Sequence, residues 1–543
     1  MSLNYNRTLA EVFSESCKSF ADKNAFTCMD RTLTYADLDR LSGLFAAYLQ
    51  QHTALKPGDR IAVQLPNILQ YPVVIFGALR AGMVVVNTNP LYTPHEIKHQ
   101  LNDSGAKALV VLANIAKNAA AIIKETGVQQ VIVTELADLH SPFKRILLNF
   151  AVKHLKKMVP PYEFPQQIEF NKALSLAGKP WQSVTQNPDD IAVLQYTGGT
   201  TGVAKGAMLT HRNLVANMAQ LNERMKDVFR SGQELYVAPL PLYHIYSFTI
   251  HCTSALALGN HSLLIPNPRD IPGFVKTLQG KPFTFFVGLN TLFNALLRNP
   301  DFCKLDFSYL RLTCSGGMAL TAETTRHWLD ITKAPVSEGY GLTETSPVVS
   351  NNPLSNVQYG TVGVPLIDTH CKVIDEAGNS LVVGEAGELC VKGPQVMKGY
   401  WQRPDATAEV IDAEGWFKTG DIAIIQADGY IKIVDRKKDM INVSGFKVFP
   451  NEVEDALSGH PDIVEVAVVG VPDGDGSETV KAFIVTANEH LTIEQVRRFA
   501  KETLTAYKVP HLIEFRKELP KTNVGKILRR ELRDQELDKA KKQ

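Results

Sequence analysis

The sequence predicts an α/β protein, with a parallel sheet in its larger N-terminal part and a smaller α+β unit at its C-terminal end. Helix-like and strand-like segments alternate through the first half of the chain. A charged stretch follows near residue 435, and a short mixture of strands and helices comes after it. Strands interleaved with helices favour a parallel sheet that is covered on both faces.

The alternation is clearest between residues 34 and 112. Thr34 can cap a helix over residues 34–51, because Asp37 follows at the third position and an apolar stripe continues at helical spacing. The segments after it are expected to form strands at residues 60–65, 84–86 and 108–112 and a helix at residues 73–79.

The C-terminal part has a different pattern, and we place a domain boundary near Asp435. The charged residues 435–439 separate two strand-like runs, and the chain beyond them predicts helices at 451–458 and 493–504 and strands at 464–471 and 480–485. We therefore expect a domain over residues 1–434, a linker at 435–439 and a second domain over 440–543.

The composition fits a globular protein with a sizeable core and disfavours a nucleic-acid-binding protein. Hydrophobic residues make up 45% of the 543 residues, and 57 Lys and Arg are balanced by 56 Asp and Glu. The cysteines form no C-x-x-C pair, so we expect neither a zinc ribbon nor a disulfide framework, and a reducing, cytoplasmic compartment. The N-terminus lacks an apolar signal segment, and the longest apolar run, residues 72–86, is shorter than the roughly 20 residues of a membrane span.

Residues 143–159 form a basic amphipathic pattern. Apolar side chains line one helical face, and most of the basic side chains lie elsewhere on the helix. Such a helix can lie on an anionic membrane surface. The alternative is an ordinary surface helix whose apolar face packs on the protein core.

The segment YTGGTTGVAKG at residues 196–206 is the most informative for chemistry. Its glycines expose backbone N–H groups to an anion, its threonines add hydroxyl donors, and Lys205 adds a positive charge. These groups suit a polyphosphate, although the chain contains no Walker A pattern. A nucleophile elbow at Thr200 and a plain glycine-rich turn are the alternatives.

Four further segments carry side chains suited to a nucleotide and a metal ion. Residues 338–344 (EGYGLTE) offer an aromatic face, a hydroxyl and the kind of carboxylate that magnesium needs beside phosphate oxygens. Asp421 can present its carboxylate to ribose hydroxyls, and Arg436 has a permanent, forked charge. Lys526 follows a glycine turn that can hold it as a point charge.

In this order, these segments resemble those of the adenylate-forming superfamily of acyl-CoA synthetases, luciferases and peptide-synthetase adenylation domains. Within it, the chain is most similar to the bacterial long-chain fatty acid–CoA ligases, through residues 195–199, 209–213, 267–273, 290–297 and 523–532. The resemblance covers nearly the whole chain. It departs from the family pattern at Gly198, where many relatives carry Ser, and at Ala204, where Pro is common.

The resemblance implies a large N-terminal domain of doubly wound sheets and a small, mobile α+β C-terminal domain that rotates about a hinge at Lys438. It implies an enzyme that joins a long-chain fatty acid to CoA with ATP and Mg²⁺, through an acyl-adenylate, and releases AMP and diphosphate. The acyl-CoA would feed fatty acid degradation or lipid synthesis. We expect this enzyme to be cytoplasmic and to meet its substrate, and membrane lipid, at the cytoplasmic face of the inner membrane. A homodimer is left open, and no nucleic acid partner is expected.

The resemblance also implies the nucleotide-binding residues. The β- and γ-phosphates would be bound by Thr197, Gly198, Gly199, Thr200, Thr201, Gly202 and Lys205. Adenine would be framed by Gly316, Gly317, Glu338, Gly339 and Tyr340, and the ribose would contact Asp421 and Arg436. Mg²⁺ would lie near Thr197 and Glu344. Thr343 would contact the α-phosphate, and Lys526 would bridge this phosphate and the fatty acid carboxylate.

The acyl and CoA sites follow from the same resemblance. Phe248 falls where long-chain relatives place an aromatic gate, and Val287, Gly288 and Leu289 would line the acyl tunnel; core packing is the alternative for Phe248. Gly445 would line the pantetheine tunnel. His244 would orient the carboxylate or assist the thiol step, with a satisfied structural histidine as the alternative.

Two classes of rival function remain at this stage. The first comprises other adenylate-forming enzymes: ligases of aryl or short-chain acids, luciferase-like oxygenases and modules that load a carrier protein. The second is a catalytically silent nucleotide- or acyl-binding protein. This second class is disfavoured because all four charged residues expected at the site are present: Glu344, Asp421, Arg436 and Lys526.

Overall fold

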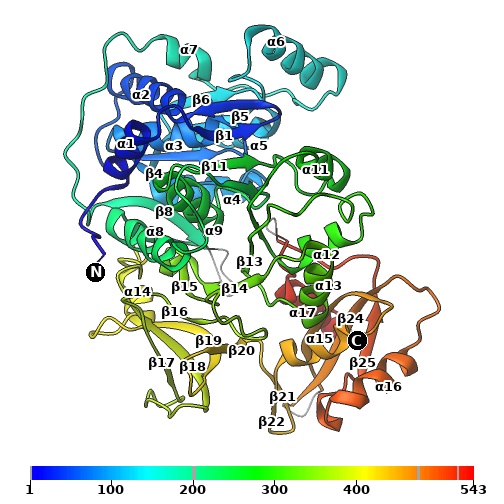
Figure 1. Cartoon of the computed structure of the whole chain (residues 1–543). Helices are drawn as coiled ribbons and strands as arrows, with labels where there is room; N and C mark the ends of the chain where they lie inside the picture. The colour runs from blue at the N-terminus through cyan, green and yellow to red at the C-terminus, as the bar shows by residue number, and fades with distance from the viewer. Residues whose placement is uncertain (1–2, 198–203, 474–476, 523–524, 543) are drawn as a thin grey trace.

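The computed structural model describes residues 3–197, 204–473, 477–522 and 525–542, and it has the α/β architecture that the sequence predicts (Figure 1). Two large sheets make up most of the chain, a four-stranded sheet follows them, and the C-terminal strands and helices form a smaller unit beside them (Figure 1). The expected large N-terminal part of doubly wound sheets and small C-terminal part are confirmed.

The seven-stranded sheet is parallel except for its last hairpin. Alternate residues of its central strands face opposite helical layers: Ile61 and Val63 pack with α2 and α3, whereas Ala62 packs with α4 and α5. In spatial order its strands are β7 (Gln167–Glu169), β6 (Gln130–Thr134), β5 (Ala106–Leu112), β3 (Arg60–Gln64), β4 (Val84–Asn87), β8 (Ile191–Thr197) and β9 (Lys205–Thr210).

The helices around this sheet begin and end close to where the sequence predicts. The Thr34 and Asp37 capping box opens α2, as expected. The helices of this part are α1 (Leu9–Ser19), α2 (Tyr35–His52), α3 (Gln70–Arg80), α4 (Pro94–Ser104), α5 (Ala116–Ala120), α7 (Phe170–Ser175) and α8 (His211–Met225).

The nine-stranded sheet has a parallel centre and antiparallel edges. Its order is β16 (Val364–Pro365), β15 (Val348–Asn351), β14 (Val336–Gly341), β13 (Leu312–Gly316), β12 (Phe285–Gly288), β10 (Leu235–Ala238), β11 (His261–Leu264), β1 (Asn24–Cys28) and β2 (Arg31–Thr34). The helical segments associated with it are α9 (Ile245–Ser247), the π-helix η4 (Phe248–Ser254), α10 (Ala255–Ala257), α11 (Ile271–Leu278), α12 (Asn290–Leu297), α13 (Ala322–Thr332) and the 3₁₀ turn η5 (Thr343–Thr345).

The antiparallel four-stranded sheet leads into the C-terminal unit. Its strands are β17 (His370–Ile374), β18 (Ala386–Lys392), β19 (Phe417–Ile425) and β20 (Ile431–Arg436), with α14 (Pro404–Val410) beside β19. Because Arg436 pairs with Asp421 across β19 and β20, the first two residues of the expected linker belong to a strand. The linker expected at 435–439 therefore overlaps the end of β20 by two residues.

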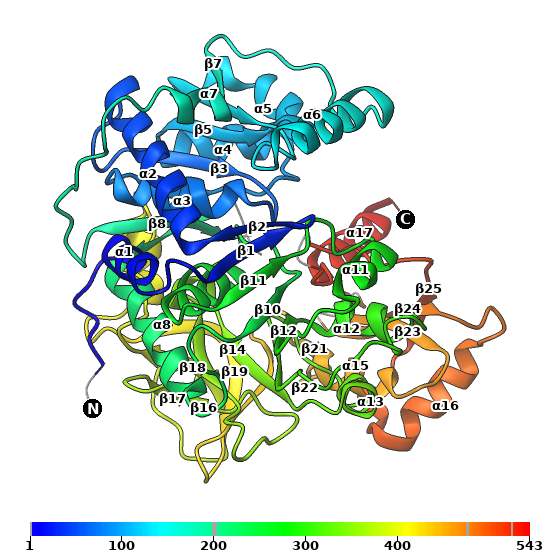
Figure 2. The same cartoon turned by 45° about the horizontal axis from the view of Figure 1, so that its top comes forward.

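The C-terminal unit contains the predicted helices and strands. Its elements are β21 (Ile441–Val443), β22 (Phe446–Val448), α15 (Pro450–Ser458), β23 (Ile463–Pro472), β24 (Glu478–Thr486), α16 (Ile493–Thr503), η6 (Ala506–Lys508), β25 (Leu512–Phe515) and α17 (Arg529–Lys542). Strand β23 pairs with β24, and β24 pairs with β25. Figures 1 and 2 both place α17 close to α12, far from it in sequence.

The amphipathic segment differs from its prediction. It forms α6 (Pro142–Phe150), continues as a π-helix, η3 (Ala151–Leu155), and ends before Lys157, whose φ of 51° is not helical. No residue of α6 or η3 is buried, so the alternative of a helix packed on the core is wrong. Among the described residues no helix is long and apolar enough to span a membrane.

Candidate active site

A cavity of about 2420 Å³ lies where carboxyl ends of strands from both large sheets meet the C-terminal unit. It is lined by every described residue predicted for the nucleotide, the metal ion and catalysis. These residues are Thr197, Lys205, His244, Gly316, Gly317, Glu338, Gly339, Tyr340, Thr343, Glu344, Asp421, Arg436 and Lys526, and the predicted hinge residue Lys438 lines it too.

The phosphate side of the cavity is formed by the hairpin of β8 and β9. Thr197 ends β8 and Lys205 begins β9, and the Thr197 hydroxyl donates to the Lys205 carbonyl oxygen at 3.4 Å. The predicted phosphate-binding residues between them lie outside the described residues: Gly198, Gly199, Thr200, Thr201 and Gly202.

The nucleoside side is formed by the ends of β13 and β14 and by β19. Gly316 packs closely on Tyr246, because a Cβ there would lie 3.1 Å from the Tyr246 ring. The Tyr340 hydroxyl donates to Asp421 at 2.6 Å, and Arg436 lies 3.7 Å from the other Asp421 oxygen. A carboxylate held by a hydroxyl and a guanidinium on one face can still accept from ribose hydroxyls on another.

Lys526 enters this cavity from the C-terminal unit. A Cβ on Gly317, whose φ is +87°, would lie 3.1 Å from Lys526 Cε, and Thr291 of α12 donates to the Gly525 carbonyl oxygen at 3.1 Å. Burial, with a smaller effect of Arg436, lowers the Lys526 pKa to about 8, against the attraction of Asp421 and Glu344. The ammonium therefore faces charges from several elements that are far apart in sequence.

Burial favours the neutral forms of two further groups in the cavity, His244 and Glu338. Burial and the nearby Lys526 lower the pKa of His244 to about 3, so this ring is neutral at physiological pH. Its Nδ1 accepts the Tyr246 N–H at 3.3 Å, which leaves the proton on Nε2 as a donor. Burial raises the Glu338 pKa to about 8, although its carboxyl accepts the Leu320 N–H.

Glu344 is the candidate metal ligand. Burial raises its pKa, and a hydrogen bond from the Tyr400 hydroxyl to Oε1, at 2.8 Å, opposes this rise. The described residues contain no cluster of three or more His, Cys, Asp or Glu side chains able to hold a metal by themselves. A single carboxylate beside a phosphate site suits Mg²⁺, which binds through one or two carboxylates together with substrate phosphates.

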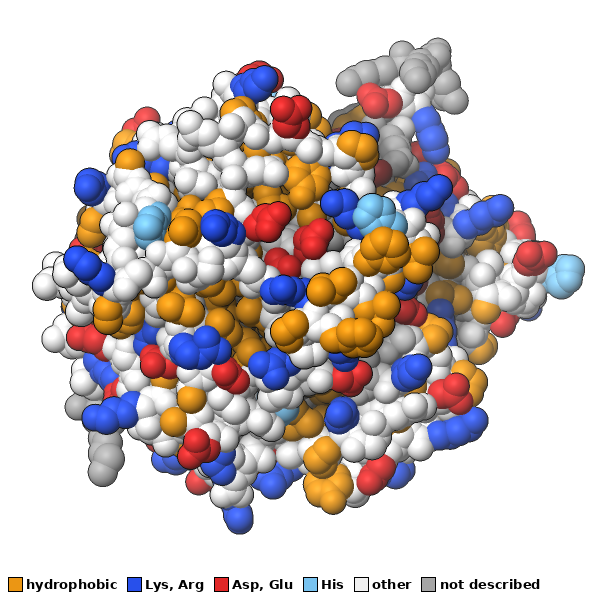
Figure 3. All heavy atoms as spheres, turned by 90° about the horizontal axis from the view of Figure 1, so that it is seen from above, with side chains coloured by type: hydrophobic (Ala, Val, Ile, Leu, Met, Phe, Trp, Pro, Cys, Tyr) orange, Lys and Arg blue, Asp and Glu red, His pale blue; other side chains and the backbone are white. Residues whose placement is uncertain are grey.

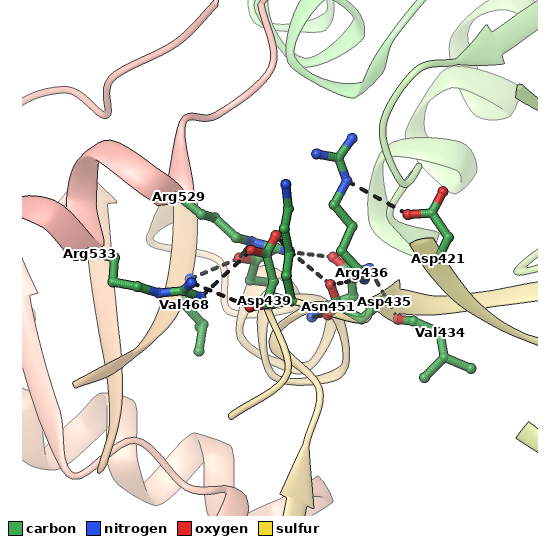
Figure 4. A network of polar contacts seen from close by, with 11 residues as sticks. Asp421, Val434, Asp435, Arg436, Asp439, Asn451, Val468, Arg529 and Arg533 are labelled. Carbon is green, nitrogen blue, oxygen red and sulfur yellow. Dashed lines mark hydrogen bonds and ion pairs between the residues drawn. The ribbon is translucent and has the colours of Figure 1, made fainter. Parts of the chain in front are cut away.

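A polar network joins the end of β20 to α17, which begins three residues after Lys526 (Figure 4). Arg529, at the start of α17, donates to Asp435 at 3.0 Å and to Glu454 at 2.8 Å, and lies 3.8 Å from Asp439. The Asn451 N–H also donates to Asp435, at 2.7 Å. Asp435 is thus bound to residues that follow it by up to a hundred positions, and its side chain is fully buried.

The predicted acyl and CoA residues do not line this cavity. Phe248 is fully buried in the core at the start of η4, and Val287 and Leu289 pack in another core cluster. A Cβ on Gly288 would lie 2.5 Å from the Phe293 ring. Gly445 is exposed on the β21–β22 turn, with a φ of +89°.

Sequence reasoning missed Tyr400 and Arg529. Tyr400 lies between Lys205 and Glu344, and Arg529 holds the network of Figure 4. For Arg529 a signal was present, because its side chain follows Lys526 within the same motif-like run. Tyr400 follows a glycine but lies in no charged or glycine-rich loop that would mark a site.

Comparisons with known proteins identify the family to which the chain belongs. The model of the AMP-binding enzyme family matches residues 13–401, and the model of the AMP-binding enzyme C-terminal domain matches residues 452–526. A long-chain-fatty-acid–CoA ligase of Escherichia coli O157:H7 is 52% identical over 533 residues, which cover 97% of this chain and 94% of that protein. A long-chain-fatty-acid–CoA ligase of Haemophilus influenzae is 47% identical over 540 residues, which cover 98% of this chain and 96% of that protein.

A solved structure extends the agreement to three dimensions. An anthranilate CoA ligase in complex with anthranoyl-AMP has a TM-score of 0.87 at 25% identity, and the match covers 99% of both chains. The predicted resemblance is therefore confirmed by sequence and by fold. With its nucleotide-type cavity and both family models matched in order, the chain belongs to the AMP-binding enzyme family.

Proposed function

We propose that this protein is a long-chain fatty acid–CoA ligase. It converts ATP, a long-chain fatty acid and CoA into acyl-CoA, AMP and diphosphate through an acyl-adenylate, for fatty acid degradation or lipid synthesis. The observation that carries the proposal is the position of Lys526 against Gly317, in a cavity that also contains Glu344, Asp421 and Arg436. The relatives named long-chain-fatty-acid–CoA ligase support the substrate class.

In the first step a carboxylate oxygen attacks the α-phosphorus of ATP and diphosphate leaves. Negative charge builds on the α-phosphoryl oxygens, and the Lys526 ammonium stabilises it while holding the carboxylate, an effect of roughly 3 kcal/mol for one well-placed donor. Thr343 contacts the same phosphate, Asp421 and Arg436 hold the ribose, and Thr197, Lys205 and the loop between them hold the β- and γ-phosphates. When bound through Glu344 and the phosphates, Mg²⁺ supplies charge neutralisation.

In the second step the CoA thiolate attacks the acyl carbon and AMP leaves. This step needs space where Lys526 now lies, so we propose that the unit over residues 440–543 rotates relative to 1–434, with Lys438 as the hinge. Gly445, exposed here, would then face the pantetheine chain, for which a missing side chain leaves room. Neutral His244 can donate from Nε2 to the fatty acid carboxylate or the thioester oxygen.

The acyl chain is proposed to enter beside Phe248. This ring is 0% exposed at the start of η4, and the apolar residues Val287 and Leu289, at the end of β12, are buried in a second core cluster that also contains Ile250 of η4. If the Phe248 ring fills the entrance of the acyl tunnel when no substrate is bound, it keeps the apolar surface of the tunnel out of water. The segment that would move is η4, a π-helix, and π-helical turns are frequent at functional sites.

The same proposal includes reversible contact with membrane lipid through α6 and η3. Their apolar side chains project into solvent: Phe143 is 80% exposed and Leu155 is 72% exposed. Exposed Lys153, Lys156 and Lys157 lie beside them. Figure 3, which looks onto the side where α6 lies in Figure 1, shows a hydrophobic patch among Lys and Arg side chains. Apolar anchors flanked by cations complement an anionic lipid surface.

Vesicle binding tests the membrane part. We expect flotation with phosphatidylglycerol vesicles to be lost when Phe143, Leu147 and Phe150 are all changed to Ser. Val382 and Val383 are similarly exposed but lie before β18. Changing both of them to Ser should leave flotation unchanged. Equal flotation of all three proteins would exclude α6 as the docking element.

A substrate panel tests the reaction. Purified protein with Mg·ATP and CoA is expected to form thioesters of palmitate and oleate with release of AMP, and to turn over acetate and benzoate far more slowly. Activity confined to acetate or benzoate would contradict the assignment of Phe248 to the acyl gate. Acyl-AMP without any acyl-CoA would point to a carrier protein or another acceptor.

A further inference from the structure

We propose that Tyr400 is a positioning residue that holds Lys205 and Glu344 apart, each oriented for the nucleotide and its metal ion. The inference rests on the proposed function, because that function places triphosphate and Mg²⁺ between these two side chains. Nothing in the sequence motifs marks Tyr400, and its role follows from its two contacts and from the way its backbone is held.

The Tyr400 side chain contacts one charged group through its hydroxyl and the other through its ring. The hydroxyl donates to Glu344 Oε1 at 2.8 Å, and Lys205 Nζ lies 5.1 Å from the ring centroid. Tyr400 is only 8% exposed, and all three side chains line the same cavity. A cation within about 6 Å of an aromatic ring is attracted to its face.

The backbone around Tyr400 fixes the ring in this place. Residues 397–401 pair with β9, since Met208 donates to Gly399 at 2.9 Å and Trp401 donates to Gly206 at 2.8 Å. At the other end of the segment, Met397 donates to the Glu344 carbonyl oxygen at 2.7 Å. One short segment thus holds both the strand that begins at Lys205 and the turn that carries Glu344.

This arrangement keeps two opposite charges from neutralising each other. Within the described part of the chain, neither Lys205 nor Glu344 has an ion-pair partner within 4.0 Å, although both line the same cavity and contact Tyr400. The hydroxyl donates to Glu344 Oε1, the carboxyl also accepts its own backbone N–H, and its remaining lone pairs can bind a cation. The ring holds the Lys205 ammonium without cancelling its charge. A direct Lys205–Glu344 pair would withdraw both groups from Mg·ATP.

Two substitutions separate the contributions of hydroxyl and ring. Tyr400→Phe removes the hydrogen bond to Glu344 and keeps the ring, so Mg²⁺ should be needed at roughly tenfold higher concentration for half-maximal ATP binding. At saturating Mg²⁺ its ATP affinity should stay close to that of the wild type. Tyr400→Leu removes the ring as well, and it should also weaken ATP binding at saturating Mg²⁺ by roughly tenfold. Calorimetric titration of ATP at a series of Mg²⁺ concentrations measures both effects without turnover.

Trp401→Phe is the matched control. It removes the hydrogen bond from the indole to the Asp103 carbonyl oxygen, at 3.1 Å, and so loosens the same segment without touching Lys205 or Glu344. It should lower the melting temperature but leave the Mg²⁺ dependence unchanged. In a Glu344→Gln background, Tyr400→Phe should produce no further change in Mg²⁺ dependence, because the carboxylate that it positions is gone.

The inference is wrong if Tyr400→Phe keeps the wild-type Mg²⁺ dependence, or if Trp401→Phe shifts it as much. The proposed function fails separately: a wild-type protein that binds Mg·ATP but activates no fatty acid would contradict it. In that case the role of Tyr400 would still be tested by comparing the ATP affinities of Tyr400→Phe and Tyr400→Leu.

Discussion

At the residue scale, the proposed chemistry depends on Lys526, whose protonated form is destabilised by burial. Lys526 lies against Gly317 and near Arg436, and its pKa is lowered to about 8 by burial and then by Arg436. The acidic groups Asp421 and Glu344 oppose this shift without cancelling it. Because burial is the main cause, the ammonium lacks the solvation that it would have in water, and bound anions such as ATP and a carboxylate would compensate for this loss.

This shift predicts an alkaline limit for the first half-reaction. Only protonated Lys526 stabilises the anionic transition state, so kcat/KM for acyl-adenylate formation should fall as pH rises through about 8. An ordinary lysine would give this fall near pH 10. The measurement is the pH profile of acyl-AMP formation without CoA. A Lys526→Arg variant, whatever its overall rate, should lack this fall, and a wild-type profile that is flat to about pH 10 would contradict the lowered pKa.

At the element scale, a network joins β20 to α17, whose first residue follows Lys526 by three positions. This residue, Arg529, contacts Asp435 and Asp439 (Figure 4). These two aspartates come before and after Lys438 in the sequence. If Lys438 is the hinge, the contact with Asp435 must break on rotation, whereas Asp439 and Glu454 move together with Arg529. The pair of Arg529 and Asp435 then favours the arrangement seen here.

Two isosteric substitutions test this interpretation. Asp435→Asn removes the charge on the side of the hinge that stays fixed, so acyl-adenylate formation should slow by roughly tenfold. Thioester formation from supplied acyl-AMP should be unchanged or faster. Asp439→Asn, on the moving side, should affect the ratio of the two rates much less. Equal effects of both variants on this ratio would show that the network stabilises the fold without selecting an arrangement.

The elements also show why some of the molecule was predictable from sequence. Helix α2 was predicted almost to the residue, because its capping box and apolar stripe are local. The residues expected for the nucleotide at the ends of β8 and β14 were predicted from motifs that lie in single short segments, whereas Gly316 and Gly317 at the end of β13 followed only from the family resemblance. Tyr400 was missed because its partners come from β9 and η5, which are far from it in the sequence. The end of β20 was missed because Arg436 is fixed by pairing with Asp421 in another strand.

At the scale of the whole molecule, the chain is arranged for one of two reactions. Lys526 lies in the cavity, Gly445 faces solvent, and Phe248 is buried in the core. On the proposed mechanism, this arrangement suits adenylate formation, and attack by CoA would require the C-terminal unit to turn. The ends of strands from the large sheets line the cavity proposed for the nucleotide, and the smaller unit contributes Lys526 to it.

The most direct test of this account is the Lys526→Ala variant, assayed separately in its two half-reactions. Acyl-AMP formation from palmitate and Mg·ATP should fall by at least about 100-fold, the range seen when a single charge-stabilising donor is removed. Acyl-CoA formation from supplied palmitoyl-AMP and CoA should stay close to that of the wild type, because Lys526 would have left the cavity by then. Equal impairment of both half-reactions would contradict the role of Lys526 and the rotation that separates the two steps.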